Sequence, residues 1–203
     1  MKKVDLGAGP FLYPKPATLV GSDVRGRPNY CVAACVGIVN MEPPTLSVSL
    51  NKTHYTTIGI RENGTFSINT PSADMVEITD YCGLVSGHKV DKSDIFDTFY
   101  GKAGTAPMIR ECPLNLECKV VQTLEFPGEV AFVGEIVAAY VDEACLTDGR
   151  PDIKKVDPLL FSFGDNLYWR VGDRLAQAWS VGKRFLGKET GNAGLSEESK
   201  AEA

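Results

Sequence analysis

The chain has 203 residues, 43% of them hydrophobic and 23% charged, and a formal net charge of -5 at pH 7. This composition is typical of a folded globular protein and excludes a disordered or fibrous chain. The negative charge, with no segment dense in lysine and arginine, argues against a nucleic-acid-binding protein. No apolar stretch approaches the roughly 20 residues that span a bilayer, and Met1–Asp5 lead to glycine and proline instead of a signal-peptide core. We therefore expect one cytoplasmic domain without a membrane partner.

The first quarter of the chain predicts three strands. Residues 17–22 are a short strand candidate that ends at the turn signal of residues 23–28. A second strand of small and apolar residues runs from Asn29 to about Val39. The proline pair at positions 43 and 44 ends it, and residues 45–50 then alternate polar and apolar side chains, as a strand with one buried face does.

The next segment predicts two helices around a fourth strand. Residues 56–64 begin with hydroxyls and close with Asn-Gly, which favours a short helix stopped by glycine. Residues 65–70 alternate again as a strand does, and residues 71–82 open with Pro-Ser before apolar residues at helical spacing. Residues 83–92 carry two glycines and a basic cluster, which indicates a loop.

The remaining chain predicts mostly strands. A short helix is expected at 93–100, and the Pro-Gly at positions 127 and 128 favours a hairpin between two long strands. The strand candidates here are 114–124, 130–140, 159–163 and 167–171. From position 187 the chain is rich in glycine, serine and charged residues, so we expect a folded domain over 1–186 and a disordered tail over 187–203.

Many short strands with few helical interruptions predict a mainly β protein. The Gly/Pro turns between them favour a closed antiparallel barrel with inserted helices. A regular alternation of strands and helices would have indicated a parallel sheet, and it is absent from the pattern.

The cysteines do not form a metal-binding or redox motif in the sequence. Their spacings include no C-x-x-C pair, and the chain has only two histidines, so we expect no metal site. Reduced, buried thiols are the main prediction, with a redox-active Cys31/Cys35 pair as the alternative. The six cysteines are Cys31, Cys35, Cys82, Cys112, Cys118 and Cys145.

Two segments carry groups that bind anions. Residues 52–57 and 86–92 each combine lysine, histidine and hydroxyl side chains at the end of a predicted element. They either converge on one small dianion or form two independent solvated loops. The strand from Asn29 to Cys35 carries mostly small side chains, so it either accommodates a flat aromatic ring or marks a tight helix contact. No G-x-G-x-x-G or G-x-x-x-x-G-K-[ST] motif is present, which argues against a Rossmann or P-loop nucleotide site.

An ordered series of motifs closely resembles the flavin reductase-like family, which includes the flavoredoxins. The resemblance covers roughly residues 10–185 and implies an FMN-binding, antiparallel Greek-key split β-barrel that forms a homodimer, with FMN near the subunit interface. The motifs are Tyr13-Pro14-Lys15-Pro16, Asn29-Tyr30, Pro43-Pro44 with Leu46-Ser47-Val48-Ser49, Phe66-Ser67-Ile68-Asn69, Asp80-Tyr81-Cys82-Gly83, Ser86-Gly87 with Asp91-Lys92, and Leu116-Glu117-Cys118.

The resemblance also implies the cofactor-binding residues. The strand from Asn29 to Cys35 would line the flavin ring, the corner after residue 48 would surround the ribityl phosphate, and Lys92 would reach the phosphate or the ring. The predicted set is Asn29, Cys31, Val32, Ala33, Ala34, Cys35, Ser49, Leu50, Lys52, His54, Tyr55, Thr56, Ser86 and Lys92. No catalytic residue is assigned, because hydride transfer to a flavin needs no protein acid or base.

The chain departs from the family pattern at two positions. His54 and His88 stand where arginine is common, and an imidazole with an ordinary pKa near 6.5 is mostly neutral at pH 7. We therefore predict that FMN affinity rises as the pH falls from about 8 to 6, as His54 becomes protonated.

Three functions follow from the resemblance. The first is an oxidoreductase that transfers electrons from NADH or NADPH to flavin. The second is a flavoredoxin-type carrier that retains FMN and exchanges electrons with a redox partner protein. The third is a split barrel that has lost its cofactor and serves as a binding module.

Overall fold

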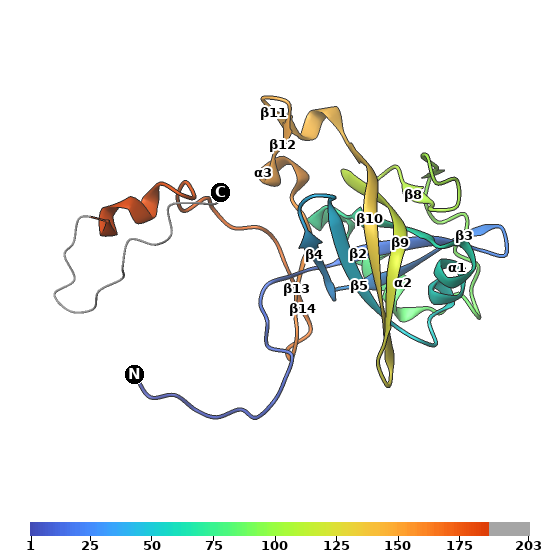
Figure 1. Ribbon diagram of the computed structural model, residues 1–203, viewed down its shortest axis with the longest axis horizontal. Coiled ribbons are helices and arrows are strands. Elements are labelled where there is room, and N and C mark those ends of the chain that lie inside the picture. Colours follow the sequence, from blue (N-terminus) through green and yellow to red (C-terminus); the bar gives the residue numbers. More distant parts are fainter. Residues whose placement is uncertain (187–203) are drawn as a thin grey trace. The chain divides into compact units, whose positions relative to one another are not determined.

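The computed structural model describes residues 1–186, and an antiparallel sheet is its main element (Figure 1). The sheet has seven strands in the order β3-β2-β6-β9-β10-β5-β4, and every neighbouring pair is antiparallel. The mainly β prediction is therefore confirmed. The strands are β2 (Thr18–Val24), β3 (Arg27–Ala33), β4 (Val36–Asn40), β5 (Thr45–Asn51), β6 (Thr65–Thr70), β9 (Leu114–Glu125) and β10 (Glu129–Val141).

The short connection between β3 and β4 requires the sheet to curl. Strands β3 and β4 are the two outer strands of the sheet, yet only Ala34 and Cys35 separate them in the chain. The edges must therefore come together, since two extended residues reach only about 7 Å. The Ser49 amide donates to the Cys35 carbonyl at 2.9 Å, which ties this connection to β5. The single strand predicted over 29–39 is thus wrong, because the chain leaves one edge and joins the other at this point.

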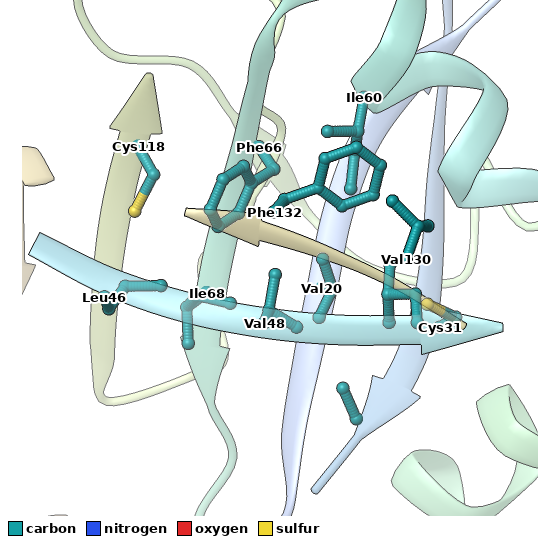
Figure 2. Close-up of a cluster of buried hydrophobic side chains, with 12 residues drawn as sticks. Val20, Cys31, Leu46, Val48, Ile60, Phe66, Ile68, Cys118, Val130 and Phe132 are labelled. Atoms are coloured by element: carbon teal, nitrogen blue, oxygen red, sulfur yellow. The ribbon is translucent and has the colours of Figure 1, made fainter. Parts of the chain in front are cut away.

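The interior of the curled sheet is apolar. Leu46, Val48 and Leu50 alternate with less buried residues along β5, as the sequence predicts. Figure 2 shows Leu46 and Val48 among side chains of the other strands, with Phe66, Phe132 and Ile60 of the first helix in the same cluster. The cluster comprises Val20, Cys31, Ala33, Leu46, Val48, Leu50, Ile60, Phe66, Ile68, Cys118, Val130 and Phe132.

The two predicted helices form outside this sheet. Helix α1 (Tyr55–Asn63) ends at Gly64, whose φ is 65° and whose amide donates to the Ile60 carbonyl. A side chain at Gly59 would place its Cβ 2.1 Å from the Asp23 carbonyl oxygen, so glycine allows α1 to lie directly on β2. Helix α2 (Val76–Leu84) follows the 3-10 turn η1 (Ala73–Met75) and packs against β3.

The short helix predicted over 93–100 does not form. Residues 93–96 form turns and bends, and β7 (Thr98–Phe99) pairs with β8 (Met108–Ile109). Phe96 packs edge-on against Tyr30 with ring centroids 5.4 Å apart, so tertiary contact of this aromatic side chain decides the local conformation.

Smaller elements complete the described chain. The predicted strand pair near the C-terminal end forms as β13 (Leu160–Ser162) and β14 (Leu167–Trp169), and β1 (Lys15–Pro16) joins it. The others are η2 (Glu143–Cys145), β11 (Leu146–Thr147), β12 (Arg150–Pro151), α3 (Ile153–Val156) and η3 (Val181–Phe185).

The chain divides into two units, Met1–Val171 and Gly172–Ala203. All elements except η3 belong to the first unit. The tail predicted over 187–203 lies outside the described residues. Within residues 1–186, no helix has the length and apolar character needed to cross a membrane.

Candidate functional site

A cavity with several polar side chains in its lining lies between β3, the start of α1, the end of α2 and the loop that follows α2. We call it the inner cavity, and its volume is about 130 Å³. It brings together seven of the predicted site residues: Asn29, Cys31, His54, Tyr55, Thr56, Ser86 and Lys92. Gly83, Leu84, Val85 and Gly87 complete its lining. The two anion-binding segments recognised in the sequence, 52–57 and 86–92, therefore meet at one cavity.

Helix α1 presents its N-terminus at this cavity. His54 is the N-cap residue, its side chain makes no capping hydrogen bond, and the first turn contains no acidic residue. The positive end of the helix dipole is therefore not compensated by a nearby carboxylate of its own first turn. This arrangement favours an anion.

Lys92 supplies a buried positive charge to the inner cavity. Its exposed fraction is 2%, and its Nζ donates to the carbonyls of Cys82 at 3.2 Å and Val85 at 3.1 Å. Burial lowers the pKa of Lys92, while the neighbouring thiols of Cys31 and Cys82 act in the opposite direction. No carboxylate among residues 1–186 forms a salt bridge with it. The ammonium thus has one N–H left and a charge that an incoming anion would neutralise.

His54, which lines the same cavity, has an unpartnered polar atom. Its Nδ1 is buried and has no hydrogen-bond partner among the described residues. Burial lowers the pKa of His54, partly opposed by the Glu129 carboxylate. Such an atom in a folded protein is costly unless a ligand or water satisfies it. His88 lies further out, with its Nε2 3.3 Å from the Thr53 carbonyl oxygen and its ring 4.9 Å from that of Tyr55.

Neutral groups fix the floor of the cavity. The Asn29 amide donates to Thr56 Oγ1 at 2.7 Å, which connects β3 to the first turn of α1. Burial raises the pKa of the Cys31 thiol, so Cys31 stays protonated and contributes a small apolar surface. Gly87 closes the other side, where a Cβ would lie 2.4 Å from Asn29 Oδ1 and 2.6 Å from a ring carbon of Tyr55.

Several predicted site residues lie elsewhere. Lys52 forms a salt bridge with Glu125 at 2.9 Å and does not line the inner cavity, because the carboxylate at the end of β9 draws its ammonium away. Ser49 is a β5 residue within the sheet, and the side chains of Ala33 and Leu50 belong to the barrel interior. Val32 packs on the other face of β3, near Leu19 and Tyr30.

The bare end of the β3 ribbon borders a second hollow. Ala34 is half-buried and Cys35 is exposed. Cys35 lines an open, mainly apolar hollow of about 330 Å³ together with Pro10, Leu12, Lys15, Val36, Gly37, Ser47 and Phe163. We call residues 34–37 the ring wall. Cys31 in the inner cavity and Cys35 on the ring wall are four residues apart in the chain, on either side of the end of β3, and the two hollows share no lining residue.

All six cysteines are free, as the sequence predicts. Five of them are buried, as the sequence predicts, but Cys35 is exposed, so the prediction of a buried thiol is wrong there. Cys31 and Cys35 border different hollows. The four-residue spacing does not give a shared face, because β3 ends at Ala33 and the strand that would have carried both is broken.

Sequence reasoning missed a larger cavity beside the first. We call it the outer cavity: its volume is about 290 Å³, and it shares Asn29, Tyr55, Gly87 and Lys92 with the inner cavity. Its remaining lining comes from the β2–β3 hairpin and the loop after α2: Val24, Arg25, Arg27, Pro28, His88, Lys89, Val90 and Asp91. The turn at 23–28 was visible in the sequence, but nothing in the pattern places its arginines opposite the loop.

Comparison with known proteins identifies the family. Residues 11–167 match the flavin reductase like domain family, and the chain belongs to it. The flavoredoxin from Methanosarcina acetivorans is 55% identical, with a TM-score of 0.89 over 91% of this chain and 100% of that one. The flavoredoxin of Desulfovibrio vulgaris (Miyazaki F) is 42% identical, with a TM-score of 0.84 over 90% and 100%. An FMN-binding protein from Thermus thermophilus is 25% identical, with a TM-score of 0.75 over 87% and 100%.

These matches confirm the resemblance read from the sequence motifs. The matched region contains the seven-stranded sheet, both helices and both cavities. Structural neighbours of this chain include flavin reductase split-barrel proteins, which agrees with a sheet whose outer strands come together.

Proposed function

We propose that the protein is an FMN-binding oxidoreductase that passes electrons from NADH or NADPH to flavin. One observation carries this proposal: a buried lysine that has no carboxylate partner among residues 1–186 and a histidine with an unpartnered ring nitrogen line one cavity, at a helix N-terminus without a side-chain cap. That set of groups suits a phosphate dianion. The family match and the similarity to flavoredoxins support the choice of a flavin nucleotide.

The residues present fit FMN. Lys92, His54, Thr56 and Ser86 would hold the phosphate, and Asn29 would contact the ribityl chain. The ring wall would support the isoalloxazine, because small residues leave its backbone accessible to a flat ring. FMN supplies the hydride-accepting ring system, while the protein contributes binding, orientation and partial exclusion of water.

We further propose that the protein is a homodimer, as the family resemblance implies. The edge strand β4 carries Ile38 and Val39, whose exposed fractions are 61% and 57%, and Met41 follows it at 82%. An exposed apolar edge strand beside the ring wall is a surface that a second copy would cover. Light scattering should give twice the chain mass of 22.0 kDa. A mass of one chain at micromolar concentration would contradict the dimer.

An anaerobic absorbance experiment tests the function. Purified protein is saturated with FMN, and NADH or NADPH is then added in separate samples. The reductase predicts binding of FMN and catalytic loss of the reduced nicotinamide absorbance when excess FMN or another acceptor is supplied. A protein that takes up no FMN would overturn the proposal and leave a cofactor-free binding module.

The second candidate is a flavoredoxin-type electron carrier with retained FMN. The observation that favours it is the 55% and 42% identity to two flavoredoxins. It predicts a tightly held yellow cofactor that a reduced redox protein or dithionite can reduce, but that neither NADH nor NADPH reduces. The same anaerobic samples therefore separate the two candidates.

A further inference from the structure

The outer cavity is a cationic site in an acidic protein. Arg25, Arg27, His88, Lys89 and Lys92 line it, and Asp91 is its single acidic residue. The whole chain, in contrast, has a net charge of -5. Local concentration of positive charge in a concave site attracts anionic ligands.

Part of this charge is already neutralised and part is not. Arg27 forms a salt bridge with Asp91 across the cavity. Arg25 and Lys89 form no salt bridge with any carboxylate among the described residues 1–186. The guanidinium of Arg25 and the ammonium of Lys89 are therefore available to a ligand.

The backbone at Arg25 gives an independent indication. Arg25 and Gly26 are the two central residues of the β2–β3 turn, with φ of 54° and 74°. Asparagine or glycine suits the first of these positions, because an ordinary L-residue is strained at positive φ. An arginine held there provides a cation at the cavity mouth at the expense of local conformational energy. Such an outlier points to a role for the side chain.

We propose that the outer cavity binds a second nucleotide phosphate, next to the phosphate of the flavin. The inference rests on the proposed function, because the wall shared by the two cavities would place the second phosphate beside FMN. FMN has a single phosphate group, so the second one belongs to a dinucleotide. Two ligands would supply this phosphate group: NADPH through its 2′-phosphate, and FAD through its adenylate half.

The test uses two probes on the full-length protein. Calorimetry measures adenosine 2′,5′-bisphosphate binding to the FMN-saturated protein, which represents the NADPH source. A separate titration of the flavin-free protein compares FAD with FMN. The variants are Arg25→Asn, which removes the charge and keeps a residue suited to positive φ, and Lys89→Gln.

We expect each variant to weaken the binding of at least one probe about tenfold, because each loses a charge-assisted hydrogen bond to phosphate. The loss for that probe should exceed any loss for FMN. Lys119→Gln is the control, since Lys119 is an exposed lysine of β9 outside both cavities. Loss of the bisphosphate alone identifies the NADPH source, and loss of FAD alone identifies the FAD source.

Two results would overturn the inference: wild-type protein that binds neither probe, or variants whose affinities match that of the Lys119→Gln control. Failure of the proposed function would give a different experimental result. In that case FMN does not bind, while the flavin-free protein still binds the bisphosphate and loses it on substitution of Arg25 or Lys89.

Discussion

Two lysines from the predicted site show how position decides the use of a charge. Lys52 lies on the surface, where its side chain is 36% exposed and bridges to Glu125. Lys92 is 2% exposed and contacts only carbonyl oxygens among its described hydrogen-bond partners. In the sequence the two residues look alike, since each belongs to a basic, hydroxyl-rich segment.

The difference lies in what neutralises each ammonium. Hydrogen bonds from Arg61 and Lys52 hold the pKa of the Glu125 carboxyl below its usual value, so this surface cluster is already balanced. The inner cavity around Lys92 offers dipoles, and no carboxylate is among its lining residues. An anion therefore gains much more at Lys92 than at Lys52.

The largest expected effect comes from Lys92→Met. Under the proposed function the Lys92 ammonium would contact the phosphate, so its removal should raise the FMN dissociation constant about 100-fold through loss of a charged hydrogen bond at a buried position. Quenching of flavin fluorescence measures the constant, and circular dichroism checks that the variant is folded. Equal FMN affinities of a folded Lys92→Met variant and the wild type would show that Lys92 does not bind the phosphate.

Gly87→Ala should have the next largest effect. The added Cβ meets Asn29 Oδ1 and the Tyr55 ring, so the loop must move away and the inner cavity changes shape. We expect about tenfold weaker FMN binding, in the range of a steric change at a binding site. Gly128→Ala is the matched control, because a Cβ at Gly128 meets no atom within 4 Å. A similar loss in both variants would indicate a general effect on folding.

The pH dependence of FMN binding should be a smaller effect that depends on His54. Burial lowers the pKa of His54 in the flavin-free protein, and a bound dianion would raise it. FMN affinity should therefore increase as the pH falls, and the increase should continue below about 6.5. The FMN phosphate itself takes up a proton near pH 6, so wild type and His54→Gln are compared at each pH. If the FMN affinities of the two proteins change with pH in parallel, protonation of His54 does not cause the pH dependence.

The same histidine predicts the opposite trend for the stability of the flavin-free protein. The folded pKa of His54 is below the unfolded value near 6.5, so between these values the unfolded chain binds more protons. The His54 contribution to the free energy of unfolding is therefore lost as the pH falls below about 6.5. Urea titrations of wild type and His54→Gln at pH 7.5 and 5.5 measure it. A wild type whose stability relative to the variant does not fall would contradict this sign.

Lys52→Met should have the smallest effect. It removes one of the two cations paired with Glu125, and Arg61 remains. Exposed pairs of this kind contribute little to stability. We expect FMN affinity and the thermal unfolding midpoint to stay close to those of the wild type. A loss of affinity comparable to that of Lys92→Met would mean that the β5–α1 corner contacts the phosphate in the way the family resemblance suggests.

The sequence predicted more of the fold than of the site. Alternation in β5, the glycine at the end of α1 and the Pro-Gly turn before β10 are local signals, and the elements formed where they indicated. The helix expected over 93–100 failed because Phe96 is drawn into a contact with Tyr30, far away in the chain. The break between β3 and β4 was missed for a similar reason, since curling of the sheet, and not a turn residue, imposes it.

The sequence by itself determined the strand-rich pattern, the family and the two segments that hold anion-binding groups, because each depends on neighbouring residues or on the order of motifs. Only the tertiary structure decided which of those groups share a cavity. It paired Lys52 with Glu125, brought the buried Lys92 and His54 to one cavity, and brought Arg25 and Lys89 to another. Charge neutralisation and burial depend on contacts between residues distant in the chain, and spacing along the sequence does not record them.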